Sequence, residues 1–106
     1  MPVTPVSDRE DTARRLHACE AEILALGVRR LALFGSVLNG HPRLDSDVDF
    51  LVEFVPGKKS YDRLLALAAL LEERLGRRVE LVTTSALSPF IGPRILAEAC
   101  DVVRAA

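Results

Sequence analysis

Two aspartates separated by one residue are the feature of this chain that points most directly to chemistry. Asp47 and Asp49 open a hydrophobic run, and an earlier hydrophobic run ends in Gly35-Ser36. Because side chains alternate across a strand, both aspartates should project from the same face. Two like charges on one strand face repel each other, which makes the pattern costly for stability. The arrangement instead favours a site where a divalent cation lies beside a phosphate-binding turn.

Each half of this pattern also has a plainer explanation. The backbone N–H groups and the hydroxyl of Gly35-Ser36 could hold a phosphate oxygen. Gly-Ser is also a common strand-ending turn, and without the other motifs this structural explanation is favoured. Asp47 and Asp49 are stronger indicators, because Mg²⁺ prefers carboxylate oxygens and two carboxylates can bridge two metal ions. The alternative explanation for Asp47 and Asp49 is a solvated strand edge on which acidic side chains oppose aggregation.

Glu80 is a candidate third carboxylate on a later strand. Its neighbours Val79 and Leu81 should point to the opposite face, which leaves Glu80 free to act as a general base or a third metal ligand. The alternative is an exposed glutamate paired with Arg77 or Arg78, and without the other motifs that alternative would be favoured.

Composition limits the class of protein. The chain has 106 residues, of which 49% are hydrophobic and 27% charged, so we expect one domain with a packed core. A formal net charge of -1 argues against binding a long nucleic acid. We expect no membrane span and no secretory leader, and therefore a cytoplasmic protein. Cys19 and Cys100 lie in apolar patterns and are predicted to be buried free thiols rather than a disulfide or metal site.

Hydrophobic spacing and capping residues predict the elements that position these side chains. Residues 1–6 are expected to be a loose lead-in. A capping box at Ser7 should start a helix over 8–26, and Ser60 and Gly76 should begin and end a second helix. Its apolar stripe is predicted to consist of Tyr61, Leu64, Leu65, Ala68, Leu71 and Leu75, with Leu67 and Leu70 off the stripe. Strands are predicted over 30–34, 48–54, 78–83 and 101–104, with a turn at 89–92 and a short helix over 93–99.

This order, helix–strand–strand–helix–strand–helix–strand, predicts an α/β (α+β) domain with a small mixed sheet. The loop between the first two strands suits an antiparallel pair, and the helix after them suits a parallel crossover. The end of one strand and the start of its antiparallel neighbour share one sheet edge. Ser36 and Asp47 should therefore lie close together, at the strand ends where such sheets bind ligands.

Three segments together resemble a known superfamily. Residues 35–40 (GSVLNG) match the motif GSxxxG, residues 46–52 (SDVDFLV) match SDxDxxV, and residues 75–82 (LGRRVELV) resemble LGxxVDLV. The combination is similar to nucleotidyltransferases of the DNA polymerase β superfamily, and within it to the minimal nucleotidyltransferase (MNT) domains. The resemblance covers residues 16–103, nearly the whole chain.

The resemblance implies a single nucleotidyltransferase-fold domain over residues 1–106 that carries out Mg²⁺-dependent transfer, with two metal ions and ATP as the nucleotide triphosphate. It assigns catalysis and metal binding to Asp47, Asp49 and Glu80, and nucleotide binding to Gly35, Ser36, Gly40 and Ser46. MNT proteins commonly pair with HEPN-domain toxins and act as antitoxins by transferring AMP to a toxin tyrosine. A HEPN partner and a hetero-oligomer or homo-oligomer are therefore expected.

Two departures from the family pattern keep a second function open. Many relatives carry an arginine just after the Gly-Ser, where this chain has Val37-Leu38-Asn39, and Arg43 or Lys58 could substitute. The third carboxylate is Glu80 where Asp is frequent. The alternative function is a non-catalytic binding module that neutralises its partner by contact alone. Small-molecule adenylylation is disfavoured, because the chain has no room for a second domain to bind such an acceptor.

Overall fold

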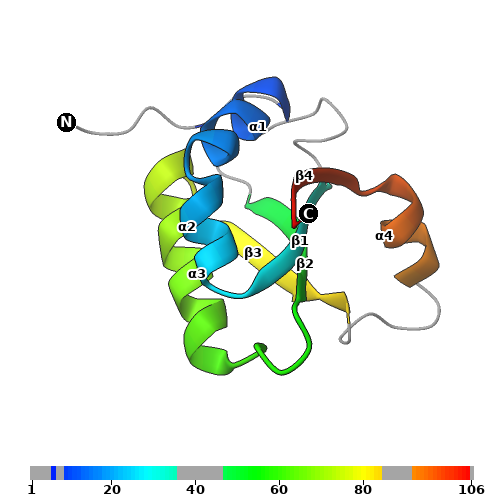
Figure 1. The fold of residues 1–106 in the computed structure, drawn as a ribbon. Helices are drawn as coiled ribbons and strands as arrows, with labels where there is room; N and C mark the ends of the chain where they lie inside the picture. Colours follow the sequence, from blue (N-terminus) through cyan, green and yellow to red (C-terminus); the bar gives the residue numbers. More distant parts are fainter. Residues whose placement is uncertain (1–5, 7–8, 36–46, 85–91, 106) are drawn as a thin grey trace.

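A four-stranded mixed sheet organises the part of the chain that this computed structural model describes, namely residues 6, 9–35, 47–84 and 92–105 (Figure 1). The elements in chain order are α1 (Arg9–Ala18), α2 (Glu20–Ala25), β1 (Val28–Phe34), β2 (Val48–Phe54), α3 (Tyr61–Leu75), β3 (Val79–Thr83), α4 (Gly92–Glu98) and β4 (Cys100–Arg104). The strand order is β3-β2-β1-β4. β1 is antiparallel to both β2 and β4, whereas β2 and β3 are parallel. The predicted mixed sheet is confirmed, and so is the order of the elements after the first predicted helix.

The predicted first helix is interrupted at Cys19, where the structure has two helices. Cys19 has φ -115° and ψ 20°, and its N–H donates to the carbonyl of Leu16, three residues back. Such a tightened turn ends α1, and α2 begins at Glu20. Neither glycine nor proline marks the break, so the regular spacing of apolar residues predicted one continuous helix.

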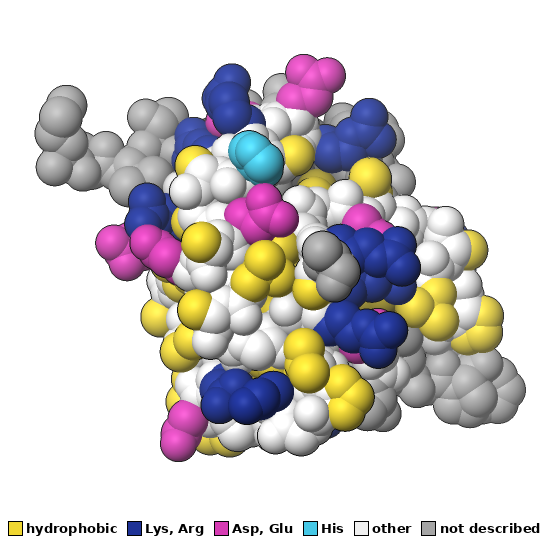
Figure 2. All heavy atoms as spheres, viewed as in Figure 1, with side chains coloured by type: hydrophobic (Ala, Val, Ile, Leu, Met, Phe, Trp, Pro, Cys, Tyr) yellow, Lys and Arg dark blue, Asp and Glu magenta, His cyan; other side chains and the backbone are white. Residues whose placement is uncertain are grey.

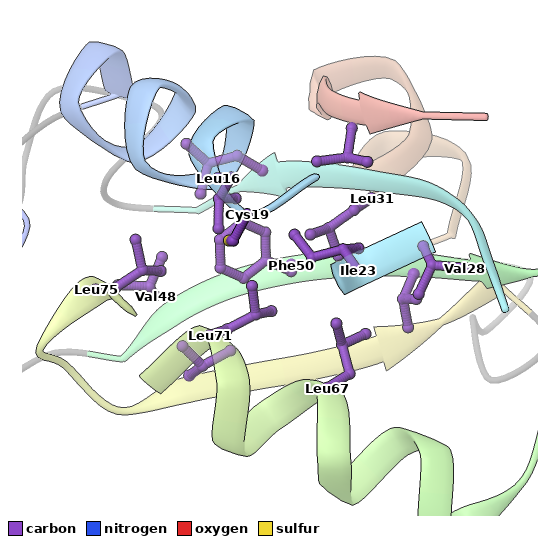
Figure 3. Packing of buried hydrophobic residues seen from close by; sticks show 14 of the residues in the cluster. Leu16, Cys19, Ile23, Val28, Leu31, Val48, Phe50, Leu67, Leu71 and Leu75 are labelled. Carbon is purple, nitrogen blue, oxygen red and sulfur yellow. The ribbon is translucent and has the colours of Figure 1, made fainter. Parts of the chain in front are cut away.

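Helices α1, α2 and α3 cover one face of the sheet, and the core lies between them (Figures 1 and 3). Leu16, Ile23 and Phe50 are fully buried there. Figure 3 shows Phe50 of β2 among side chains from all three helices. Alternate residues of β2, such as Asp49, belong to the opposite face, which lies away from these helices. Figure 1 shows α4 on that other side of the strands.

The buried stripe of α3 differs from the predicted one. Leu67, Leu71 and Leu75 are fully buried, whereas Tyr61 is 73% exposed and Leu65 is 51% exposed. The prediction was wrong in placing Leu67 off the stripe and Tyr61 and Leu65 on it. Apolar residues occupy more than one side of this helix, so spacing alone did not decide which side meets the sheet.

Both ends of α3 are capped as predicted. The Ser60 hydroxyl accepts a hydrogen bond from the Arg63 N–H at 3.2 Å. Gly76 ends the helix in the left-handed region with φ 67°. One turn earlier, the Glu72 carboxylate accepts a hydrogen bond from the Val79 N–H at 3.0 Å. This contact ties the end of α3 to the start of β3 and so helps to place Glu80.

The N-terminal lead-in is anchored at residue 6. Val6 is fully buried, its N–H donates to the Leu75 carbonyl at 2.8 Å, and its carbonyl accepts from the Arg77 guanidinium at 3.2 Å. The expectation of a loose lead-in is therefore wrong for this residue. Residues 1–5, the capping box at 7–8 and the turn over 89–91 lie outside the described residues.

Both cysteines are free thiols, as predicted, but only Cys19 is buried. Cys100 is exposed because it opens β4, which forms one edge of the sheet. None of the helices in the described ranges is long and apolar enough to cross a membrane.

Candidate active site

The closest approach in the candidate site is between the end of β1 and the start of β2. In the antiparallel register, Phe34 pairs with Asp49, which brings Gly35 next to the Asp49 carboxylate. Gly35 has φ 81°, and a Cβ placed on it would overlap an Asp49 carboxylate oxygen. Only glycine fits here, because any side chain would both strain the backbone and displace Asp49. The sequence predicted that Gly35 would allow close approach to a ligand, and the structure shows a close approach to Asp49.

The parallel register of β2 and β3 brings in the third carboxylate. Asp49 pairs with Glu80, and Val48 pairs with Val79. Val48 and Val79 both belong to the core cluster, so Asp49 and Glu80 project together from the opposite face. Asp49 is partly buried and Glu80 is exposed. Glu80 thus lies beside another carboxylate, while the Arg77 guanidinium donates to the backbone of Val6.

The electrostatics of the site show how close these acids are. Burial, the negative charge of Glu80, a hydrogen bond with Glu80 and the charge of Asp47 together raise the pKa of Asp49 to about 6, and burial contributes most. A hydrogen bond between two carboxyl groups requires a proton on one of them. The site therefore concentrates negative charge that a proton or a cation would neutralise.

The sequence-predicted residues fall into two groups in the structure. Gly35, Asp47, Asp49 and Glu80 meet at one edge of the sheet, on the face away from α1–α3. Ser36, Gly40 and Ser46 lie in the segment 36–46, outside the described residues, as does Arg43. Lys58 follows β2 at its far end, where its side chain packs against Gly27. It is therefore at the wrong end of β2 to replace the missing arginine near Gly35.

The carboxylate oxygens of Asp47, Asp49 and Glu80 suit a hard divalent cation, although the three side chains do not form a close group in the structure. Within residues 9–35, 47–84 and 92–105, no three His, Cys, Asp or Glu side chains are grouped closely enough to hold a metal ion. Carboxylate oxygens are nevertheless the ligands that Mg²⁺ prefers, and a cation would relieve the repulsion that raises the pKa of Asp49. The chemistry of Asp47, Asp49 and Glu80 fits Mg²⁺.

Comparison with known proteins gives the relatives of this chain. A protein of Methanocaldococcus jannaschii that carries the provisional name of protein adenylyltransferase is 42% identical over 81 residues, covering 76% of this chain and 86% of its own length. The protein adenylyltransferase MntA of Thermococcus cleftensis is 42% identical over 74 residues, covering 68% of this chain and 72% of its own.

Solved structures share the fold. A provisionally named minimal nucleotidyltransferase matches with a TM-score of 0.69 and 35% identity, over 83% of this chain and 93% of its own. A toxin–antitoxin structure with AMP-PNP matches with a TM-score of 0.63 and 22% identity, over 81% of this chain and 73% of its own. An MNT antitoxin in complex with tri-AMPylated Shewanella oneidensis HEPN toxin matches with a TM-score of 0.55 and 19% identity, over 84% of this chain and 72% of its own.

The family model for the nucleotidyltransferase domain matches residues 17–101. This span contains β1, β2 and β3 and with them Gly35, Asp47, Asp49 and Glu80. The chain belongs to the nucleotidyltransferase domain family.

Proposed function

We propose that this chain is a Mg²⁺-dependent adenylyltransferase that transfers AMP from ATP to a tyrosine hydroxyl of a HEPN-type toxin and thereby acts as its antitoxin. The observation that carries the proposal is the position of Asp49, which lies between Gly35 and Glu80 at the edge where β1 ends and β2 begins. The names of the relatives and the AMPylated HEPN toxin bound to an MNT antitoxin of this fold support AMP transfer to a HEPN-type partner, and the tyrosine acceptor comes from the family resemblance. Because ATP is the proposed donor, we place the reaction in the cytoplasm, where that nucleotide is made.

Two carboxylates would hold the metal, and a third lies close by. Asp47 and Asp49 are the proposed ligands, and Glu80 lies beside Asp49, where it can complete the set or accept a proton. When bound, Mg²⁺ neutralises charge on the triphosphate and helps to ionise the attacking hydroxyl. The nucleotide-binding roles of Gly35, Ser36, Gly40 and Ser46 stay predictions from the sequence.

The chain's own groups would position and deprotonate the acceptor. The tyrosine oxygen attacks the α-phosphorus of ATP, an O–P bond forms, the bond to the β-phosphate oxygen breaks, and pyrophosphate leaves. The hydroxyl proton passes to a carboxylate, for which Glu80 is the exposed candidate. Gly35 contributes by letting the β1 backbone come close to the Asp49 carboxylate, whose place a Cβ would partly fill.

The proposal is tested by Asp49→Asn in a transfer assay with labelled ATP and a HEPN-domain toxin as the acceptor. We expect transfer to fall by about 100-fold or more, because the variant removes a ligand charge where the phosphates bind. Asp62→Asn is the matched control, since Asp62 is an exposed aspartate in the first turn of α3, away from the site. Transfer by Asp49→Asn at the rate of the natural protein would overturn the assignment.

A second experiment separates catalysis from neutralisation by contact. Toxin activity is measured with the natural protein and with the double variant Asp47→Ala, Asp49→Ala. If AMP transfer neutralises the toxin, the double variant still forms the complex but leaves the toxin active. Full neutralisation by the double variant would instead support the non-catalytic binding module.

A further inference from the structure

A polar hollow lies at the opposite end of the strands from the carboxylates. It has a volume of about 440 Å³ and is lined by Arg29, Arg30, Glu53, Val55, Pro56, Arg104 and Ala105. β1 runs antiparallel to both β2 and β4, so the start of β1 meets the ends of the other two strands here. Glu53 is four residues along β2 from Asp49, a separation of about 13 Å. The hollow is therefore distinct from the candidate active site.

The walls of the hollow are fixed by backbone hydrogen bonds that continue the sheet. The Ala105 N–H donates to the Arg29 carbonyl at 2.8 Å, and the Val55 N–H donates to the Gly27 carbonyl at 2.8 Å. Figure 2 shows dark blue Lys and Arg side chains gathered beside yellow apolar surface at the end of β4. The hollow thus combines fixed backbone walls with a cationic rim, and its size lies within the range of small-molecule sites.

Within the described part of the chain, few of the N–H donors of Arg29, Arg30 and Arg104 meet an acceptor. Arg30 Nε donates to the Asp101 carboxylate. With described residues, Arg29 and Arg104 form loose ion pairs, at 3.6 Å from Glu53 and 3.5 Å from Asp101. Each guanidinium carries five N–H donors, so among the described residues the rim holds many that no acceptor takes. Among the described side chains, these three positive charges face the carboxylates of Glu53 and Asp101, which leaves a net positive charge.

We propose that this hollow binds a small ligand that carries a phosphate group. Guanidinium forks match phosphate oxygens in a bidentate geometry, which favours phosphate over a simple halide. Val55, Pro56 and Ala105 give the hollow an apolar side against which a nucleoside or similar group can pack. Nucleoside monophosphates and free phosphate share this chemistry, and the experiment distinguishes them.

The test is an NMR titration of the isotope-labelled full chain, in chelator and at constant ionic strength, with AMP or inorganic phosphate as the probe. We expect saturating shifts of the Arg29, Val55 and Ala105 amides. Tighter binding of AMP assigns a nucleotide, and equal binding assigns free phosphate. No saturating shift with either probe, or shifts confined to Asp49 and Glu80, would overturn the proposal.

Charge variants complete the experiment. In the double variant Arg29→Gln, Arg104→Gln, the affinity for AMP or phosphate should fall at least tenfold. The variant should still fold, because these two side chains are 59% and 74% exposed. Arg94→Gln is the matched control, since Arg94 is 81% exposed on α4 and outside the hollow. An equal loss in the control would overturn the proposal by showing a nonspecific charge effect. Asp49→Asn should leave this titration unchanged, so the result is independent of the proposed AMP transfer.

Discussion

Asp49 and Glu80 lie side by side on parallel neighbouring strands, and their carboxyl groups share a hydrogen bond. Burial and the adjacent acid together raise the pKa of Asp49 to about 6. A sheet selected only for stability would not place two acids in register on one face. The proposed Mg²⁺ would account for the pair, because a cation would attract both carboxylates and offset their mutual repulsion.

The raised pKa of Asp49 predicts how stability depends on pH in metal-free buffer. The folded pKa of about 6 lies above the ordinary 3.8, so the folded chain binds this proton more tightly than the unfolded chain. The resulting stability is fully present below about pH 4 and is lost as the pH rises through 6. Asparagine stays neutral at every pH, so we expect Asp49→Asn to have a higher Tm than the natural protein at pH 7.5. The difference in Tm should decrease as the pH falls towards 4.

Thermal melts of both proteins over this pH range check the prediction. Asp62→Asn, at an exposed aspartate in the first turn of α3, is measured alongside as the control. A constant difference for Asp49→Asn across the whole range would mean that the variant acts through packing and not through titration.

The contact between Gly35 and Asp49 predicts a loss that goes beyond backbone strain. Gly35 and Gly57 have nearly equal φ angles, 81° and 80°, but a Cβ on Gly57 would meet nothing within 4 Å. Each substitution to alanine should cost about 1–2 kcal/mol for the left-handed backbone. Gly35→Ala should cost more than Gly57→Ala, and it should lower AMP transfer at least tenfold because the new methyl group displaces the Asp49 carboxylate.

Urea unfolding and the labelled-ATP assay measure the two effects separately. Gly57→Ala should transfer AMP at the natural rate. Equal activity of the two alanine variants would show that the position of the Asp49 carboxylate does not matter for transfer.

Local chemistry made much of the fold predictable. The bounds of β2 were predicted to the residue, because alternation and the two aspartates mark its start. The caps of α3 were also predictable, because each depends on contacts within one helical turn. The Ser60 hydroxyl can accept a backbone N–H at the start of a helix, and Gly76 can adopt the left-handed conformation that ends one. Strand alternation and the parallel crossover were enough to predict that Asp47, Asp49 and Glu80 lie near one another.

Features that depend on distant parts of the chain could not be predicted in this way. The buried side of α3 is selected by the sheet, so Leu67 was misplaced. The exposure of Cys100 depends on β4 being an edge strand. The arginine hollow combines Arg29 and Arg30 with Arg104, which is more than 70 residues away, and no spacing rule links them.

The corrected stripe of α3 gives a stability prediction with a matched pair of leucines. Leu67 is fully buried against the sheet, and Leu65 on the same helix is 51% exposed. Leu67→Ala should lower the free energy of unfolding by about 2–5 kcal/mol, because it removes buried methyl groups and leaves a cavity. Leu65→Ala should lower it by less than about 1 kcal/mol. Urea denaturation measures both, and comparable losses would mean that the sheet does not cover the side of α3 described above.

The two cysteines should differ sharply in reactivity, although both are free thiols. Cys100 is exposed at the start of β4, whereas Cys19 is buried and burial raises the pKa of its thiol. Because the thiolate is the reactive form, a soluble alkylating reagent should modify Cys100 quickly and Cys19 only when the fold opens. Intact-mass measurement should therefore find one rapid adduct in the native protein and two in urea. Cys100→Ser should remove the rapid adduct and Cys19→Ser should keep it, and rapid modification of Cys19 in Cys100→Ser would contradict the buried position between α1 and α2.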